Sequence, residues 1–246
     1  MSQGVIDMEI DMERIRRALE TRPVFYYPSI DSTMRAAAGR DLGTLVIAGE
    51  QTAGQGRHGH SWHSESNTGI YCSLVLEATP LLTLALGLAA VDAIAGVTGL
   101  VCDLRWPNDL MLGGKKVGGI LVQLVDRSAI AGIGINVNQQ RFPPHLAREA
   151  TSLRLQTGRE ACATDILLAL IPAVEAFAKE DKDAILRLFT HASSYAAGRR
   201  VEVRQSGEGV IMGTTAGLDR DGFLVVRKDD GTDTLILAGG IRAAGS

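Results

Sequence analysis

The sequence contains few cysteines, and their spacing argues against two kinds of small module. Cys72, Cys102 and Cys162 are the three cysteines of the 246-residue chain, and they form neither a CxxC pair nor a Cys/His metal motif. A disulfide framework and a structural zinc site are therefore not expected. A reduced cytoplasmic setting is the simplest account of such widely separated thiols.

The chain also lacks a strong excess of either charge, and its first 20 residues lack the pattern of a secretory leader. Its formal net charge of −3 and pI of about 6.0 argue against a protein held to nucleic acid by bulk charge, and leave a local basic patch open. The segment through Glu20 is acidic, with Asp7, Glu9, Asp11 and Glu13, and has no apolar core of the signal-peptide type. We expect this segment to stay in the mature protein.

One apolar run, residues 81–97, approaches the length of a membrane span. Asp92 lies inside it, where a charge costs about 3 kcal/mol in lipid, and no basic residues flank the run. We therefore predict a buried helix and no contact with a membrane.

The chain has no solenoid-type repeat and no low-complexity linker, but its secondary-structure pattern changes once along the sequence. Helical and strand patterns alternate through residue 196, whereas short strands separated by Asp/Gly-rich turns follow from Gly198. The sequence therefore predicts an α+β domain over residues 1–196 and a small all-β domain over residues 197–246. A unit of about 50 residues needs to dock on a larger domain to be stable.

Hydrophobic periodicity and turn residues predict the individual elements. The expected helices are 9–20, the run from Leu81, 164–179 with a kink at Pro172, and 183–196. The expected strands are 24–27, 44–48, 69–76, 101–106, 110–112, 115–124, 129–137, 201–204, 210–213, 223–226 and 234–237.

A glycine-rich loop follows the buried strand at residues 44–48. Gly54, Gly56 and Gly59 remove side chains from a nine-residue stretch that also contains Arg57 and Trp62. Bare backbone N–H groups approach an anion easily, and a guanidinium suits phosphate or carboxylate. The stretch predicts a ligand-binding loop, with an ordinary surface turn as the alternative.

A second cluster of signals surrounds a predicted hairpin. Pro107 stiffens the corner 106–109, and Gly113-Gly114 joins two Leu/Val-rich strands. Glycines inside the following strands are costly unless something lies close to the backbone, and residues two apart face one side of a sheet. We therefore predict a narrow slot lined by Gly118, Gly119, Gly132 and Gly134. Ser32 or Thr33 is the expected cap of a short helix, and such a hydroxyl also suits a ligand.

Taken together, these motifs resemble the biotin protein ligases. The resemblance rests on five motifs in order and spans nearly the whole chain: Asp31-Ser32-Thr33, residues 50–59, Arg105-Trp106-Pro107-Asn108-Asp109-Leu110, residues 116–122 and Gly134-Ile135-Asn136-Val137. It implies a mixed β-sheet catalytic core flanked by helices and a barrel-like C-terminal domain. It also implies an enzyme that activates biotin with ATP as biotinyl-5′-AMP and then transfers biotin to a lysine of a carrier domain.

The resemblance assigns a role to each motif. Lys116 and Arg57 are the expected catalytic cations, with Asn108 and Asp109 positioning phosphates or Mg²⁺ that arrives with ATP, and no metal ligands are assigned to protein side chains. Biotin is expected to contact Ser32, Thr33, Thr52, Gly54, Gly56, Arg57, Lys116, Gly118, Gly119, Leu121, Gly132 and Gly134. The nucleotide is expected to contact Arg57, His58, Trp62, Asn108, Lys116 and Asn136.

Simpler interpretations stand beside these roles. Lys115 and Lys116 also fit a solvated turn, and Asp109 also fits an Asx turn. Trp106 is expected in the core rather than at a ligand. The histidines of the loop region have no carboxylate or cysteine partners in sequence, so exposed side chains and no metal site are expected at His58, His60 and His63.

The chain departs from the family pattern at the loop and at the corner. Gln55 stands where the family usually has a first arginine, histidines replace later basic residues, and Arg105 replaces a lysine. A lost permanent charge predicts faster release of biotinyl-5′-AMP. We also expect the loop to order over bound ligand.

Two other functions stay open from the sequence. One is a lipoate or octanoate ligase on the same scaffold, and the other is a non-catalytic biotin or adenylate sensor. For the ligase, the resemblance implies a monofunctional form without a DNA-binding domain, a biotin carboxyl carrier domain of acetyl-CoA carboxylase as acceptor, and a monomer or weak homodimer.

Overall fold

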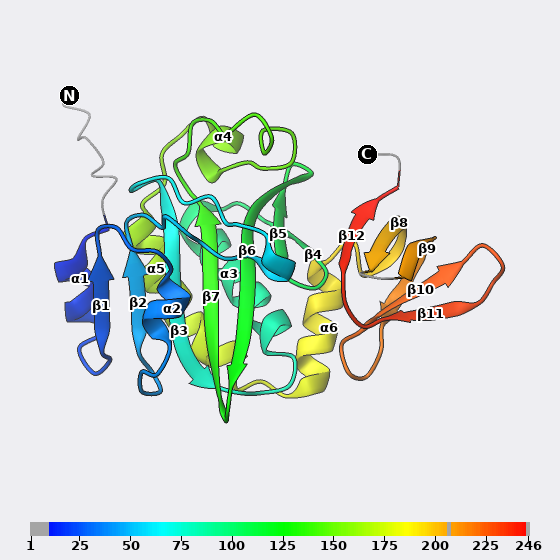
Figure 1. Cartoon of the computed structure of the whole chain (residues 1–246), viewed down its shortest axis with the longest axis horizontal. Coiled ribbons are helices and arrows are strands. Elements are labelled where there is room, and N and C mark those ends of the chain that lie inside the picture. The colour runs from blue at the N-terminus through cyan, green and yellow to red at the C-terminus, as the bar shows by residue number, and fades with distance from the viewer. Residues whose placement is uncertain (1–9, 206–207, 245–246) are drawn as a thin grey trace.

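The computed structural model describes residues 10–205 and 208–244, and it contains two β-sheets (Figure 1). The larger sheet has seven strands in the order β1-β2-β3-β7-β6-β5-β4. Its strands are β1 (Val24–Tyr27), β2 (Leu45–Ala48), β3 (Gly69–Glu77), β4 (Asp103–Arg105), β5 (Asp109–Leu112), β6 (Lys115–Val125) and β7 (Ser128–Asn136). β1 and β2 run parallel and every other neighbouring pair is antiparallel, so the expected mixed sheet is confirmed.

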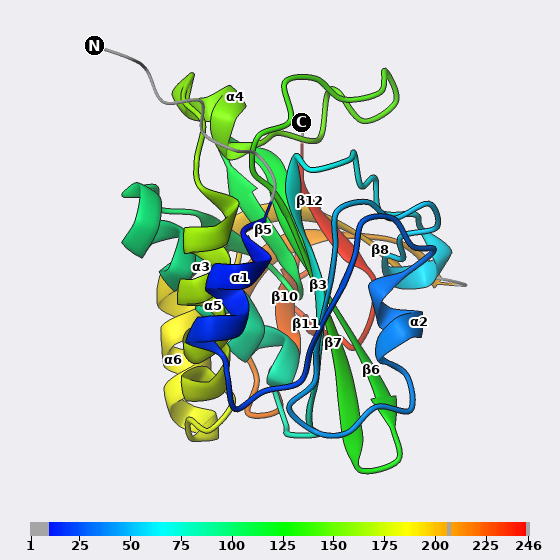
Figure 2. The ribbon, with the colours of Figure 1, turned by 90° about the vertical axis from the view of Figure 1, so that its left-hand side faces the viewer.

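Helices cover both faces of the larger sheet unequally (Figure 2). α1 (Met12–Ala18), α3 (Leu82–Thr98), α5 (Ala163–Phe177) and α6 (Lys182–Ala192) lie on one face. The short α2 (Thr33–Ala37) lies on the other face, against β2, β3 and β7. α4 (Leu153–Thr157) and the turn η1 (Arg57–Gly59) belong to the connecting segments. The face that carries only α2 leaves room for a ligand.

The apolar run at 81–97 forms the buried helix that its sequence predicts. Most residues of α3 are buried between the sheet and α5, whereas Asp92 points to solvent and Gly99, with φ +73°, ends the helix. Within the described residues, no helix combines the length and the apolar character needed to cross a bilayer.

The smaller sheet follows α6 and has the order β11-β10-β9-β8-β12. Its antiparallel strands are β8 (Ala197–Gln205), β9 (Glu208–Leu218), β10 (Leu224–Lys228), β11 (Asp233–Ile236) and β12 (Gly240–Ala243). Buried residues of this sheet join the same hydrophobic core as the larger domain. Trp106, which is 4% exposed, donates from Nε1 to the Gly222 carbonyl at 2.9 Å, so its expected place in the core is confirmed.

Several predicted boundaries need correction. α6 ends at Ala192 rather than 196 because Ser193 is extended and donates to the Leu104 carbonyl, while Ser194 binds the Asp103 carboxylate. The strand expected over 101–106 shortens to β4, and α4 and β12 were missed because each is only a few residues long. The predicted start of the first helix, Glu9, lies outside the described residues.

Candidate active site

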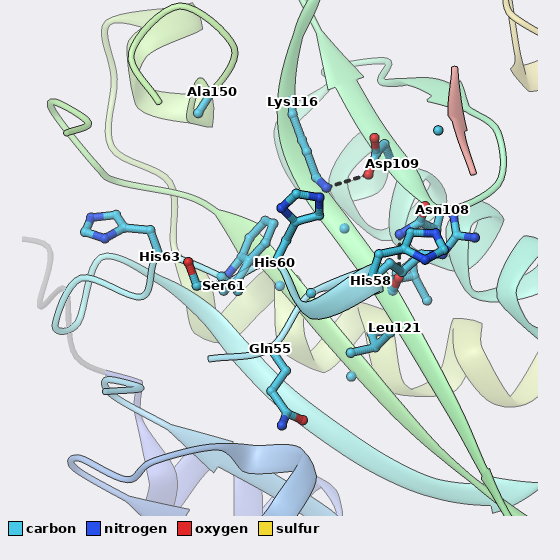
Figure 3. A pocket seen from close by; sticks show the side chains of 18 of the residues that line it. Gln55, His58, His60, Ser61, His63, Asn108, Asp109, Lys116, Leu121 and Ala150 are labelled. Atoms are coloured by element: carbon cyan, nitrogen blue, oxygen red, sulfur yellow. Dashed lines mark hydrogen bonds and ion pairs between the residues drawn. The ribbon is translucent and has the colours of Figure 1, made fainter. Parts of the chain in front are cut away.

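A cavity of about 520 Å³ lies between the glycine-rich loop, β6, β7, residues 142–150 and β12. Figure 3 shows some of the side chains that line it. It brings together most of the site residues expected from the sequence: Thr33, Gly56, Arg57, His58, Trp62, Asn108, Asp109, Lys116, Gly119, Leu121, Gly132, Gly134 and Asn136. These residues come from α2, from the glycine-rich loop before β3, from the corner before β5, and from β5, β6 and β7.

Arg57, Arg105, Asp109 and Lys116 form a charged cluster on one wall of the cavity. Asp109 Oδ1 lies 2.5 Å from Lys116 Nζ, and its Oδ2 accepts from Arg105 Nη2 at 2.6 Å (Figure 3 for the first pair). Burial alone would raise the pKa of Asp109, but the two cations outweigh it and hold the pKa below its ordinary value. The carboxylate therefore stays ionised and fixes the position of Lys116.

Arg57 enters the cluster from the glycine-rich loop. Its Nη1 donates to Asn108 Oδ1 at 3.1 Å and to the Gly239 carbonyl at 3.2 Å, which connects the loop to the turn before β12. Asn108 Nδ2 in turn donates to the Ile120 carbonyl at 2.8 Å, so its oxygen is directed at Arg57. Burial lowers the pKa of Arg57 and the nearby Asp109 partly offsets this, but an arginine remains charged at neutral pH.

Three of the four glycines expected to form a slot, Gly119, Gly132 and Gly134, line the cavity, and the ring of Trp62 lies on this glycine slot. Gly118 points to the opposite face of β6, because neighbouring residues of a strand alternate in direction. An added Cβ at Gly134 would lie 2.5 Å from Trp62 Cε2, and one at Gly119 would lie 3.3 Å from Trp62 Cζ3. Lys116 Nζ is 5.5 Å from the centre of the same ring, a cation–π contact. Gly132 has a different neighbour: an added Cβ there would lie 2.9 Å from the sulfur of Met34, so this position also has no room for a side chain.

Thr33, Gln51, Ser64 and Ser73 form a second, uncharged group that we call the hydroxyl–amide cluster. Thr33 and Gln51 line the cavity, and Ser73 lies directly behind Thr33, opposite Gly132 in the register of β3 and β7. Gln51 was missed at the sequence level. The signal available was its polar side chain three residues beyond a fully buried strand, a common position for ligand contacts.

Some predicted contacts lie outside the cavity lining. Ser32 and Gly54 are buried, and Gly118 faces the Gly134 carbonyl and Leu110. Thr52 is exposed and its Oγ1 is 3.4 Å from the Ile30 carbonyl. Ser32 is the N-cap residue of α2 as expected, but its hydroxyl makes no capping bond and has no partner within the described part of the chain.

The glycine-rich loop folds back on itself. Gln55 and Ser61 form an isolated antiparallel bridge, and Gly56 N–H donates to the His60 carbonyl at 2.7 Å. His58 adopts a left-handed φ of +54° and is exposed, as is His60, whereas His63 is half-buried beside Phe142. Among residues 10–205 and 208–244, no group of three or more His, Cys, Asp and Glu side chains is placed to hold a metal ion.

Comparison with known proteins identifies two family models along the chain. Residues 26–140 match the biotin/lipoate A/B protein ligase family, and residues 197–241 match the biotin protein ligase C-terminal domain. The bifunctional ligase/repressor BirA of Bacillus subtilis is 34% identical over 91% of this chain and 76% of its own length. The biotin–[acetyl-CoA-carboxylase] ligase of Mycobacterium tuberculosis is 33% identical over 85% of this chain and 82% of its own length.

Solved structures agree with these matches. The biotin protein ligase of Aquifex aeolicus in complex with biotin and ATP superposes with a TM-score of 0.81 and 30% identity, covering 90% of this chain and 99% of that one. The fold, the order of the motifs and relatives of 30% identity or more over most of their length all indicate the same family. The chain is a member of the biotin protein ligase family.

Proposed function

We propose that this protein is an ATP-dependent biotin–[acetyl-CoA-carboxylase] ligase. An oxygen of the biotin carboxylate attacks the α-phosphate of ATP, the bond to pyrophosphate breaks, and biotinyl-5′-AMP forms. The amine of an acceptor lysine then attacks the acyl carbon, loses a proton, and displaces AMP. Both steps pass through states rich in negative charge, which fixed cations stabilise.

The observation that carries the proposal is the charged cluster on one wall of the cavity, next to the uncharged glycine slot. Asp109 holds Lys116 in place, and Asn108 directs Arg57 toward the same cavity. Lys116 is proposed to bridge the biotin carboxylate and the α-phosphate, and Arg57 to hold the phosphates or the mixed anhydride. The apolar part of biotin is proposed to lie in the cavity beside the slot at Gly119, Gly132 and Gly134, whose backbone the Trp62 ring and Met34 contact.

The nucleotide is proposed to lie toward Trp62, His58 and Asn136. Mg²⁺ is proposed to arrive with ATP and to take its oxygen ligands chiefly from the phosphates, as is usual for this ion. The donor set agrees with that role, because both oxygens of Asp109 already contact cations.

The lipoate alternative is less well supported. The family model over residues 26–140 includes both biotin and lipoate ligases, whereas the one over residues 197–241 is specific to biotin protein ligases. We place the boundary between the two domains at residues 196 and 197, where β8 begins. The proposed acceptor is a biotin carboxyl carrier domain, in the cytoplasm, and the proposed oligomeric state is a monomer or weak dimer.

One reaction mixture tests the activity. Purified protein is incubated with labelled biotin, Mg-ATP and a biotin carrier domain, and covalent label on the carrier is measured. Label that depends on ATP supports the ligase. Tight binding of biotin without transfer would support the sensor instead, and transfer of lipoate in preference to biotin would support the lipoate ligase.

A further inference from the structure

Asp109 contacts two cations that come from the strands on either side of it. Arg105 ends β4 and lies opposite Asp109 in the register of β4 and β5, and its Nε and Nη2 both donate to Asp109 Oδ2, at 3.1 and 2.6 Å. Lys116, on β6, lies 2.5 Å from the other oxygen, Oδ1. We call these three residues the Asp109 triad.

Formal charges explain what the second cation adds to the triad. A pair of Lys116 and Asp109 alone has no net charge, so the carboxylate would cancel most of the attraction of the ammonium for a further anion. Arg105 gives the triad an excess of one positive charge. The side chains of Arg105 and Asp109 are only 21% and 15% exposed, so water and salt screen these charges only in part.

The other cations that line the cavity have different partners. Arg57 donates to two neutral acceptors, a side-chain amide oxygen and a backbone carbonyl, so its charge is not cancelled by them. Arg204 and Arg242, at the C-terminal domain, are each paired with a glutamate and are more than half exposed. Lys116 is fixed by a buried carboxylate, and its charge is therefore the one that depends most on a neighbouring cation.

We propose that Arg105 is a positioning residue for the formation of biotinyl-5′-AMP: it compensates the Asp109 carboxylate, which then fixes Lys116 without cancelling its charge. The proposal rests on the proposed function, because it takes the biotin carboxylate and the α-phosphate as the anions that Lys116 meets. Arg105 also lines the cavity, so direct contact with the nucleotide is the rival explanation. The two explanations predict opposite effects of removing Asp109 from a variant that already lacks Arg105.

The test is a double-mutant cycle, measured as the single-turnover rate of biotinyl-5′-AMP formation with saturating biotin and ATP. Arg105→Gln leaves Lys116 beside an uncompensated carboxylate, and we expect a rate about 30-fold below wild type. Adding Asp109→Asn removes that carboxylate, so the double variant should be faster than Arg105→Gln and should resemble Asp109→Asn, about tenfold below wild type. The dissociation constant of biotin should change much less than the rate.

Further variants separate charge from structural damage. Arg105→Lys keeps the charge without the planar fork and should recover most of the rate. Arg105→Met repeats the measurement if the glutamine variant does not fold. Arg154→Gln is the matched control, because it breaks another partly exposed ion pair of 2.6 Å, to Glu160, outside the cavity lining. Its rate should equal that of the wild type, and urea unfolding gives the folded fraction of every variant.

The outcomes separate this inference from the proposed function. A wild-type rate in Arg105→Gln overturns the role of Arg105, and so does a double variant no faster than Arg105→Gln, which would indicate direct contact with the nucleotide. A rate in Arg105→Lys as low as in Arg105→Gln also overturns it, because the charge would then be irrelevant. All three results leave the ligase function standing. Failure of the wild-type protein to form biotinyl-5′-AMP overturns the proposed function together with this inference.

Discussion

The charged cluster and the hydroxyl–amide cluster line one cavity but depend on different physics. In the first, Asp109, Arg105 and Lys116 keep 15%, 21% and 31% of their side chains exposed. In the second, Thr33 and Ser73 are 2% and 0% exposed and carry no charge. Partly solvated charges supply strong, adjustable attraction, whereas buried neutral groups supply direction, because a mismatched partner there stays unsatisfied. The proposed reaction needs both: cations for a changing negative charge and fixed directions for an unchanging ring.

The largest effect is expected from the cation that Asp109 fixes. Lys116→Ala should lower the single-turnover rate of biotinyl-5′-AMP formation by about 100- to 1000-fold, since a fixed donor to developing charge is lost. The affinity for biotin should fall much less than the rate, because the hydroxyl–amide cluster is intact. If the affinity for biotin falls as far as the rate does, the two clusters are not separate. Lys115→Ala is the matched control, because the Lys115 ammonium donates to the Ala147 carbonyl outside the charged cluster, and this variant should keep the wild-type rate.

Removing the anion should have a smaller effect on rate and a distinctive effect on acid stability. Asp109→Asn releases Lys116 and Arg105 from their shared partner, and we expect a rate about tenfold lower. The lowered pKa of Asp109 means that its ionised form stabilises the folded state above the unfolded pKa of about 3.9, and this contribution disappears as pH falls from there through the lower folded pKa.

Urea unfolding between pH 7 and pH 3 checks this prediction. The difference in unfolding free energy between wild type and Asp109→Asn should be constant near neutral pH and should narrow below about pH 4. A difference that stays the same down to pH 3 would contradict the ionised pairing. Asp92→Asn, at an exposed position on α3, is the control for a general effect of replacing a carboxylate by an amide.

The glycine slot joins the two clusters, and a single methyl group tests it. Gly134→Ala would place a Cβ 2.5 Å from Trp62, so the indole must move and binding of the adenylate should weaken by about tenfold. Tryptophan fluorescence should change as well. Gly96→Ala, on the exposed side of α3 with no atom within 4 Å of the added Cβ, should leave binding unchanged. Equal effects at both positions would show that the slot is not specific.

The smallest effect is expected at the exposed rim. Gln55→Arg adds the charge that the family usually has and should slow release of biotinyl-5′-AMP by about two- to fivefold, because an exposed charge is screened by water. The off-rate is measured by chasing labelled adenylate with unlabelled ligand. Gln123→Arg, on the far part of β6, is the control. An unchanged off-rate in Gln55→Arg would mean that Arg57 alone retains the intermediate.

Local patterns were sufficient for much of the fold and many of the site residues. The alternation in residues 69–76 and the Gly113-Gly114 turn predicted β3 and the β5–β6 hairpin, where both glycines have positive φ. The bare backbone at Gly119 and Gly134 was also predictable, because glycine inside a strand is costly without a neighbour that needs the space. Gln51, by contrast, had no local signal strong enough to separate it from an ordinary loop residue.

The end of α6 shows the same limit of prediction from local sequence patterns. Residues 183–196 have a continuous helical pattern, but hydrogen bonds from Ser193 and Ser194 to residues about ninety positions earlier in the chain end the helix at Ala192. Helix propensity depends on residues close together in sequence, so it cannot account for hydrogen-bond partners that are distant in sequence.

The sequence by itself determined the order of the motifs, the residue types available for the chemistry and the change from an α+β to an all-β texture. These depend on periodicity and turn chemistry, which act over a few residues. Only the tertiary structure decided that Arg57 reaches the Gly239 carbonyl 182 positions away, that Asp109 takes Lys116 and Arg105 as partners, and that the Ser73 and Thr33 hydroxyls share a hydrogen bond. Charges and hydrogen bonds choose partners by distance in space, and the packing of the whole sheet sets those distances.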